Sequence, residues 1–359
     1  MQKRCCISSK SCVRVNVRQR KDRRYERYEL EASLWAQNPG QRDIASLVGM
    51  TKDQLEAIVR NKERYIRRKT VEINGKLRDL TVPTGKLRMI HERLKFQLNK
   101  IKQPSYLCSP RKGVGQRDNA ERHVGGVQLL KLDVRQFYPK TMQEDIWRWA
   151  HHSLGIMDDV AGLFAKLVAI DGRMPFGSPI SPVLTALVHR TMFDRVYAIC
   201  GSHGLTMSLW VDDLTISGSE VPGTAVTEIR QTIRAGGFQT HKIEYLMTAR
   251  PTDITGVPIA KGRVLAPRTI HRRIQEGYGA LKVAGSDTER SNIIEKLLST
   301  LGTYRYHLGA STPEGRLTAD RMHALKQRRS RMTIVAVTSQ TQSPVQLAAP
   351  GSPEAVPWE

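Results

Sequence analysis

The chain has 359 residues, 40% of them hydrophobic, with a formal net charge of +23 and an isoelectric point near 10.1. A chain of this length can bury a sizeable core divided among subdomains, and this charge points to a polyanionic partner such as nucleic acid rather than to small neutral metabolites. A basic membrane-surface protein is the alternative. No apolar run approaches the roughly 18 to 20 residues of a membrane span, and the basic N-terminus lacks the apolar stretch of a signal peptide. We therefore expect a cytoplasmic protein.

The cysteines fit a reducing compartment. The five of them form no CxxC pair and leave one thiol unpaired in any disulfide scheme, so we expect free thiols. They are Cys5, Cys6, Cys12, Cys108 and Cys200. The ten histidines show no zinc-ligand spacing with them, and His151–His152 is predicted on the polar side of a helix.

Residues 1–40 are basic and weakly patterned, as in an extension that orders on nucleic acid or in a solvated tail. Two short helices are expected over 43–61, with Asp43 as N-cap, Gly49 at the bend and a Thr51/Gln54 capping box. This pattern is typical of a helix-turn-helix, and a DNA-binding regulator is one hypothesis. Plain packing of two helices is the other.

The next segment predicts a hairpin followed by a basic helix. Asn74-Gly75 is a hairpin turn signal, and residues 77–82 read as a strand. Arg78, Lys86 and Arg88 then form a cationic face beside the turn. Such a face either is merely solvated or contacts phosphates.

Residues 127–134 form a nearly continuous apolar run of strand length, interrupted at Asp133. A carboxylate at the end of a buried strand is costly unless it is paired or bound to a metal. A satisfied cap or an ion pair would also explain it. Pro139, with a capping box of Thr141 and Glu144, is expected to begin the following helix.

A turn in the sequence PFGSPISP leads into a long apolar helix expected from about Pro182. Two strands then flank Asp212-Asp213, followed by a helix over 224–236 and a strand over 238–248. Adjacent acids alone decide nothing, because Asp158-Asp159 is the same pair in the context of a helix start. Residues 251–332 are basic and mainly helical, and 333–359 are predicted to be disordered.

Three segments in this order resemble the palm of a reverse transcriptase. LKLDVRQFYP is similar to the first catalytic motif of that family, PFGSPISP to its nucleotide-binding turn and WVDD to its Tyr-x-Asp-Asp box. The resemblance implies an α+β right-hand polymerase of fingers, palm and thumb, with an antiparallel palm sheet and a helical thumb. The implied divisions are a basic extension over 1–40, N-terminal helices and fingers over 41–126, a palm with a fingers insertion over 127–250, an RNA-binding thumb over 251–332 and a disordered tail over 333–359.

The same resemblance implies a site with two Mg²⁺ ions, which prefer carboxylate oxygens and activate nucleotide addition. Asp133 and Asp212 would bridge the ions, Asp213 would complete or tune the site, and the Val134 carbonyl would add an oxygen. Tyr138 would stack under the incoming sugar and exclude a 2′-hydroxyl, with a core aromatic as the alternative. The remaining nucleotide-binding residues implied are Arg78, Lys86, Phe176, Gly177 and Lys242.

Two further boxes resemble retron reverse transcriptases. Asn119, Ala120 and His123 match an Asn-Ala-x-x-His box, and Ile254-Thr255-Gly256 resembles a Val-Thr-Gly box with Ile in place of Val. Both boxes would serve RNA choice. For Asn119 and His123 the alternatives are positioning of the priming hydroxyl and, equally, a structural polar network. Arg272 and Arg273 are expected to contact RNA phosphates.

The resemblance covers about residues 43–325 and has two departures. Phe176 replaces the usual Gln and cannot hydrogen-bond as Gln does, so nucleotide selection is the property affected. Trp210 replaces the usual Tyr before the acid pair.

A retron enzyme would bind dNTPs and a cognate structured non-coding RNA, prime at a guanosine 2′-hydroxyl and make branched multicopy single-stranded DNA, in anti-phage defence with an effector protein. The alternatives are another defence-associated or group II intron-like reverse transcriptase, and a helix-turn-helix nucleic-acid-binding regulator with an inactive palm.

Overall fold

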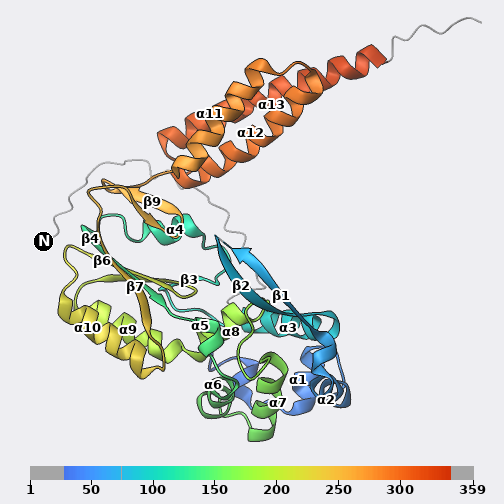
Figure 1. Cartoon of the computed structure of the whole chain (residues 1–359), viewed down its shortest axis with the longest axis vertical. Coiled ribbons are helices and arrows are strands. Elements are labelled where there is room, and N and C mark those ends of the chain that lie inside the picture. The colour runs from blue at the N-terminus through green and yellow to red at the C-terminus, as the bar shows by residue number, and fades with distance from the viewer. Residues whose placement is uncertain (1–27, 74, 341–359) are drawn as a thin grey trace, which may run out of the picture. The chain divides into compact units, whose positions relative to one another are not determined.

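The computed structural model describes residues 28–73 and 75–340, which fold into two compact units (Figure 1). The first unit contains the described residues up to Pro104 together with Tyr138–Val188, and the second contains Ser105–Phe137 and the residues from His189 onward. Residues 1–27 of the expected extension and residues 341–359 of the expected tail lie outside the described residues. Along the described chain no helix has the length and hydrophobicity that a membrane crossing requires.

The helices of the first unit surround one apolar core. Trp35, Ile44, Leu55 and Phe164 are among its fully buried side chains. The helices are 3-10 helices at Leu34–Gln37 and Lys62–Tyr65, α1 Gln41–Leu47, α2 Lys52–Arg60, α3 Gly85–Leu98, α6 Gln143–Arg148 continued by a π-helical turn at Trp149–Ser153, α7 Asp158–Val168 and α8 Ser181–Val188. Helices α1 and α2 both contact α7, so the pair with the helix-turn-helix pattern contributes to this core.

The helix starts of the first unit test three sequence predictions. The Thr51/Gln54 capping box is confirmed, because the Gln54 N–H donates to Thr51 Oγ1 at 3.3 Å and the Thr51 N–H to Gln54 Oε1 at 3.0 Å. Asp43 as N-cap was wrong: α1 begins at Gln41, and Asp43 accepts the Gly40 N–H at 2.8 Å from within the first turn. Asp158-Asp159 does occupy the first turn of α7.

The expected Thr141/Glu144 capping box was also wrong. A short helix, α5 Phe137–Lys140, contains Pro139, and α6 then begins at Gln143. Its first turn is capped by Asp145, whose Oδ2 accepts the Met142 N–H at 2.8 Å. The Thr141 side chain is buried, so it packs inside the unit.

The predicted hairpin is confirmed in the first unit. Strands β1 Ile66–Ile73 and β2 Lys76–Pro83 pair antiparallel, with Ile66 opposite Pro83. Gly75 takes a φ of 73°, as a tight turn requires, while Asn74 lies outside the described residues.

The second unit is built on a five-stranded sheet in the order β3-β5-β6-β4-β7. Its strands are β3 Leu107–Ser109, β4 Gln128–Val134, β5 Thr206–Trp210, β6 Asp213–Gly218 and β7 Thr240–Met247. All neighbours pair antiparallel except β3 and β5, which pair parallel, so the sheet is mixed rather than the antiparallel one expected. Helices α9 Arg190–Ser202 and α10 Gly223–Ala235 lie along one face (Figure 1).

The long helix expected from Pro182 is two helices. Helix α8 ends at Val188 and α9 begins at Arg190, with His189 between them at φ −100° and ψ 15°. The break coincides with the passage of the chain from the first unit to the second.

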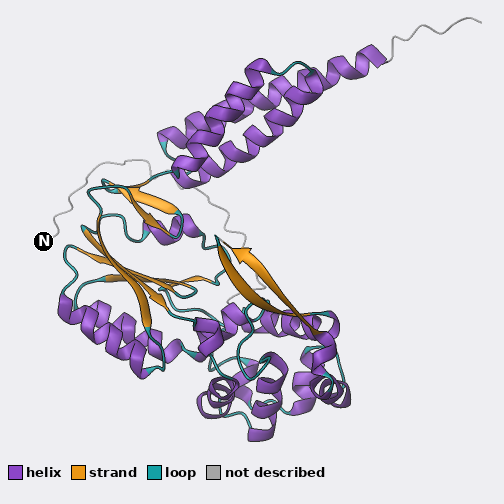
Figure 2. Cartoon of the chain, viewed as in Figure 1, coloured by secondary structure: helices purple, strands orange, loops and turns teal. Residues whose placement is uncertain are grey.

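A smaller sheet and a helical bundle complete the second unit (Figure 2). Strands β8 Thr252–Ile254, β9 Val257–Ala260 and β10 Arg263–Val264 form the sheet, and α4 Gln116–Glu121 packs on it through Ala120. The bundle consists of α11 Arg268–Val283, α12 Asp287–Leu308 and α13 Pro313–Gln340. Helix α13 therefore continues eight residues past 332, where the tail was expected to begin.

Candidate active site

Strand pairing brings the three predicted acids together in the second unit. Asp133, near the end of β4, lies opposite Asp213, the first residue of β6. The Val134 N–H donates to the Asp212 carbonyl at 3.0 Å, which fixes the tip of the β5–β6 hairpin against β4. One carboxylate oxygen of each acid lies within 4.8 Å of the others. Among the acid, histidine and cysteine side chains in the described part of the chain, these three form the one group of three or more that is spaced to hold a metal ion.

The hairpin tip consists of Val211 and Asp212, between β5 and β6. Val211 has a φ of 61°, a left-handed conformation that is rare for a β-branched residue. Such backbone strain costs on the order of 1–3 kcal/mol and persists where the surroundings enforce it. Here the neighbouring backbone does so, because the Val211 N–H donates to the Ser109 carbonyl at 3.1 Å.

The acids repel one another in the absence of a cation. Burial raises the pKa of Asp213, the negative charge of Asp133 raises it further, and Lys131 and Lys242 act in the opposite direction. Three clustered carboxylates supply the hard oxygen donors that Mg²⁺ prefers, so the donor set fits the expected metal.

A cavity of about 210 Å³ adjoins Asp133 and Asp213, and Lys242 lines it. The lysine points there because of a β-bulge: the β4–β7 register shifts between Lys131 and Asp133, and Lys242 has a φ of 50°. Sequence reasoning missed three charged residues that also line the cavity, Lys131, Glu244 and Asp253. Strand alternation from Asp133 would have indicated Lys131, but a bulge has no clear sequence signal.

Apart from Lys242, the expected nucleotide-binding residues belong to the first unit. The Tyr138 and Phe176 rings lie 5.9 Å apart between centroids, and the Arg78 guanidinium lies 5.6 Å from the Phe176 centroid. Phe176 thus replaces amide hydrogen bonds with a ring contact and a cation–π contact. Lys86 is exposed in the first turn of α3, whereas Arg88 is paired with Glu92 at 2.9 Å.

Gly177 lets this turn lie against β2. It has a φ of 121°, and a Cβ there would meet Val82 Cγ2 at 3.0 Å and the Thr81 carbonyl oxygen at 3.3 Å. The Thr81 N–H donates to the Phe176 carbonyl at 2.9 Å. A side chain at this position would therefore push the turn away from the β1–β2 hairpin.

A buried histidine that the sequence did not single out supports the same turn. His91 Nε2 donates to the Leu167 carbonyl at 3.0 Å, so Nδ1 accepts the Ser178 hydroxyl at 2.6 Å. Burial lowers the pKa of His91 to about 4, which keeps the ring neutral. His91 thereby links α3 to α7 and to the turn in the sequence PFGSPISP.

The Asn-Ala-x-x-His residues lie inside the second unit rather than on its surface. Asn119 is 1% exposed and His123 is 0% exposed. His123 contacts Ser217 Oγ of β6 and Ser208 Oγ of β5, each at 2.7 Å, and burial lowers its pKa to about 3. Of the interpretations left open by the sequence, this placement favours the structural polar network over direct contact with RNA or positioning of the priming hydroxyl.

The Thr-Gly pair forms the turn between β8 and β9. Thr255 and Gly256 have φ values of 49° and 88°, and the Gly256 N–H donates to Asp253 Oδ1 at 2.8 Å. Thr255 lines the cavity beside Asp133 and Asp213. The turn therefore lies next to the acid cluster within one unit.

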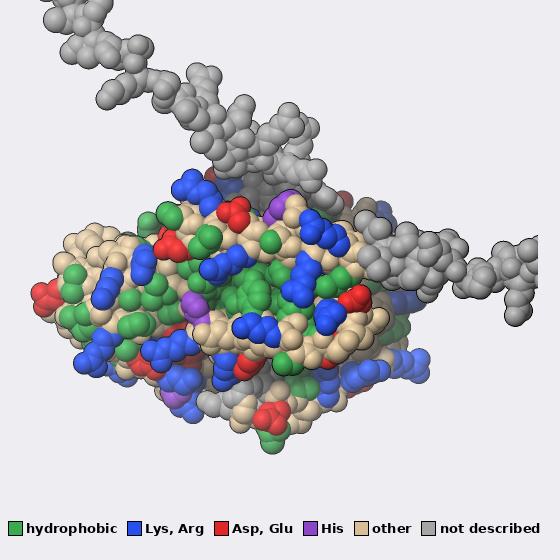
Figure 3. Space-filling model, turned by 90° about the horizontal axis from the view of Figure 1, so that it is seen from above, with side chains coloured by type: hydrophobic (Ala, Val, Ile, Leu, Met, Phe, Trp, Pro, Cys, Tyr) green, Lys and Arg blue, Asp and Glu red, His purple; other side chains and the backbone are tan. Residues whose placement is uncertain are grey.

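Arg272 and Arg273 are exposed on α11, and Arg272 forms a weak ion pair with Glu276 at 3.6 Å. Figure 3 shows Lys and Arg side chains spread over the face seen from above. Exposed cations of this kind are available to a polyanion.

Comparison with known proteins agrees with this arrangement. The family model described as "Reverse transcriptase (RNA-dependent DNA polymerase)" matches residues 61–259. The Ec86 retron reverse transcriptase of Escherichia coli is 24% identical over 183 residues, 50% of this chain and 57% of that protein. The Mx65 retron reverse transcriptase of Myxococcus xanthus is 25% identical over 247 residues, 60% of this chain and 57% of that protein.

The match thus spans little more than half the length of these curated relatives. Among solved structures, a telomerase from Candida albicans in complex with a fragment of telomeric RNA aligns with a TM-score of 0.43 and 9% identity, covering 82% of this chain and 65% of that chain. The resemblance inferred from the sequence motifs is confirmed by the family and by the retron relatives.

Proposed function

Because the chain belongs to the reverse transcriptase (RNA-dependent DNA polymerase) family, we propose that it is the RNA-directed DNA polymerase of a retron, acting in the cytoplasm. It would copy a cognate structured non-coding RNA into branched multicopy single-stranded DNA, primed at a guanosine 2′-hydroxyl. Its role would be anti-phage defence with an effector protein. The similarity to retron reverse transcriptases and the presence of both retron-type boxes support this choice.

The observation that carries the proposal is the cluster of Asp133, Asp212 and Asp213 within 4.8 Å. These carboxylates, with the Val134 carbonyl, would hold the two Mg²⁺ ions. When bound, such ions activate an attacking hydroxyl and neutralise charge on the triphosphate and leaving group. The Val134–Asp212 hydrogen bond and the strand pairing hold the acids in place before any ligand arrives.

The chain's other residues would bind and orient the nucleotide. Tyr138, whose ring lies tilted beside that of Phe176, would contact the sugar and exclude a 2′-hydroxyl. Arg78 and Lys86, both exposed, would contact the triphosphate. Lys242, directed by the bulge into the cavity beside the acids, would place a positive charge near the leaving phosphate.

Primer extension on an RNA template with dNTPs and Mg²⁺ tests this function. Asp212→Asn removes a metal-ligating charge with little change in volume, so we expect DNA synthesis to be lost while RNA binding persists. Asp158→Asn is the matched control, because Asp158 belongs to the other adjacent acid pair, at the start of α7. Wild-type activity in Asp212→Asn would contradict the active-site assignment.

Sequencing the nucleic acid that co-purifies with the protein separates the retron enzyme from a defence-associated or intron-type reverse transcriptase. A branched RNA–DNA species supports the retron, whereas linear DNA from an active enzyme supports the more general class.

A further inference from the structure

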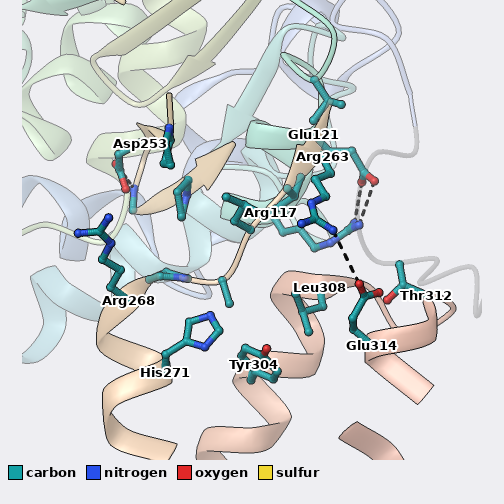
Figure 4. Close-up of a pocket in the computed structure, with 18 of the residues that line it drawn as sticks. Arg117, Glu121, Asp253, Arg263, Arg268, His271, Tyr304, Leu308, Thr312 and Glu314 are labelled. Atoms are coloured by element: carbon teal, nitrogen blue, oxygen red, sulfur yellow. Dashed lines mark hydrogen bonds and ion pairs between the residues drawn. The ribbon is translucent and has the colours of Figure 1, made fainter. Parts of the chain in front are cut away.

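A second cavity, of about 1030 Å³, lies in the second unit beside the small sheet (Figure 4). Residues from α4, from the small sheet and from the bundle helices α11, α12 and α13 line it. None of the three clustered acids is among them, so the cavity is separate from the acid cluster. Asp253 lines both cavities, and Gly256 lines this one whereas Thr255 lines the other, so both adjoin the Thr255–Gly256 turn.

The wall formed by the bundle carries an aromatic pair. His271 from α11 and Tyr304 from α12 lie 5.0 Å apart between ring centroids at an interplanar angle of 81°, and both line the cavity (Figure 4). An edge-to-face pair leaves ring surface free to stack with a further planar group. Pro258, Pro267 and Leu308 add apolar surface around it. This combination suits a flat, partly apolar ligand.

The charged groups of the cavity are mostly engaged with one another. Both Arg117 terminal nitrogens donate to Glu121, at 2.6 and 2.9 Å, and Arg263 pairs with Glu314 at 3.8 Å. Arg268 is exposed, lines the cavity and has no ion-pair partner among residues 28–73 and 75–340. The cavity therefore offers one uncommitted cation beside an aromatic surface, rather than the continuous cationic track that a duplex backbone would need.

We propose that this cavity holds one unpaired nucleotide of a bound RNA, with the base on the Tyr304–His271 pair and the phosphate near Arg268. Bases that are splayed out of RNA loops are recognised by stacking on aromatic side chains. The cavity volume of about 1030 Å³ is ample for a single nucleotide. The cavity also adjoins the Thr255–Gly256 turn, and α11 carries Arg272 and Arg273 directly after His271. This inference rests on the proposed function, which supplies a structured RNA with unpaired loops.

Fluorescence anisotropy with the full chain tests the proposal at one fixed salt concentration. The two probes are a labelled single-stranded RNA and a blunt RNA duplex of the same sequence. Stacking contributes about 1–3 kcal/mol per base, so Tyr304→Ala should weaken single-strand binding about 5- to 150-fold. Duplex binding should change less than about twofold. Tyr304→Phe keeps the ring and should bind as wild type.

Tyr245→Ala is the matched control, since Tyr245 is an exposed tyrosine of β7 that does not line the cavity. It should leave the binding of both probes unchanged. Ultraviolet cross-linking followed by mass spectrometry of the wild-type complex should place RNA on the peptide that carries Tyr304 or His271. Unchanged single-strand binding by a folded Tyr304→Ala variant, or an equal loss for both probes, would overturn the proposal.

The two proposals fail in different assays. If wild-type protein extends an annealed primer but Tyr304→Ala binds single-stranded RNA normally, the polymerase function stands and the nucleotide cavity does not. If the wild-type protein extends no primer, but the Tyr304→Ala variant binds single-stranded RNA selectively more weakly than wild type, the polymerase function fails. The cavity then stands as an RNA site.

Discussion

Asn119 Nδ2 donates a hydrogen bond to Thr255 Oγ1 over 3.2 Å, joining two segments that lie 136 residues apart. Asn119 belongs to α4 and is 1% exposed, and its Oδ1 has no hydrogen-bond partner among the described residues. Thr255 begins the left-handed turn between β8 and β9. The two retron-type boxes thus meet through this hydrogen bond, by which α4 supports the turn beside the acid cluster.

A double-mutant cycle of Asn119→Ala and Thr255→Ala tests this contact. Each single variant should lose about 0.5–1.5 kcal/mol of unfolding free energy, the net contribution of one hydrogen bond. The double variant should lose less than the sum, because both changes remove the same interaction. Chemical denaturation provides the free energies. Strict additivity would show that the two side chains do not interact.

The acid sensitivity of the fold should depend on His123. Burial lowers its pKa to about 3, well below the ordinary value of 6.5, so the folded protein holds the ring neutral while the unfolded chain takes up a proton. The stability that this neutrality confers is complete above about pH 6.5 and declines as the pH falls toward 3. Each pH unit in that range costs up to about 1.4 kcal/mol for one such group.

His123→Gln should flatten this dependence. Glutamine can still bond Ser208 and Ser217 but does not titrate. The free energy of unfolding, measured at pH 7 and pH 5, should therefore fall less in the variant than in wild type. The comparison is internal, because His91, His189 and His307, whose pKa values desolvation also lowers, are present in both proteins. A parallel decline in the two proteins would contradict the assignment.

The acid cluster of the site could be predicted from the sequence by the order of its motifs. The ordered motifs around Asp133 and Asp212-Asp213 resembled a reverse transcriptase palm, and that resemblance predicted the three acids together; the antiparallel pairing of β4 and β6 brings their ends side by side. Local motifs likewise predicted the hairpin of β1 and β2. The hairpin depends on a short-range pattern of strand and turn residues.

Features that depend on tertiary context could not be predicted. The bulge that directs Lys242, the left-handed φ of Val211 and the parallel strand β3 are enforced by neighbouring strands rather than by local propensity. Capping by Asp145 instead of Glu144 changes the helix start by one residue, which is within the usual uncertainty of helix ends. The burial of Asn119 was undecidable because a polar residue on a short helix reads equally as surface or interior.

Tyr138→Ala should admit ribonucleotides more readily. Tyr138 is half-buried with its ring beside Phe176, so deleting the ring removes the surface against which a 2′-hydroxyl would clash. Selectivity is a difference in transition-state binding, so the quantity to measure is the ratio of kcat/KM for dNTP and NTP. We expect this ratio to fall about tenfold or more, whereas Tyr138→Phe should keep it. An unchanged ratio in an active Tyr138→Ala protein would assign the ring to the core alone.

The cations of α11 should affect RNA choice more than nucleotide addition. Arg272 and Arg273 are exposed on a helix of the bundle, and neither lines the cavity beside Asp133. Phosphate contacts release counterions, so the affinity for RNA falls with salt in proportion to their number. Changing both residues to Gln should therefore reduce the slope of log K against log salt by about 1.4 to 1.8.

The same variant should make much less branched DNA when co-expressed with the native flanking RNA, while purified protein extends an annealed primer nearly as well as wild type. Arg230 and Arg234, exposed on α10, provide a control that removes the same charge from another element of the second unit. Their double Gln variant should retain branched synthesis, because the recognition depends on where the charge lies. If the two double variants lost branched DNA equally, net charge alone would account for RNA binding and α11 would have no special role. If the α11 variant lost both activities together, Arg272 and Arg273 would belong to general template binding instead of to recognition of the cognate RNA.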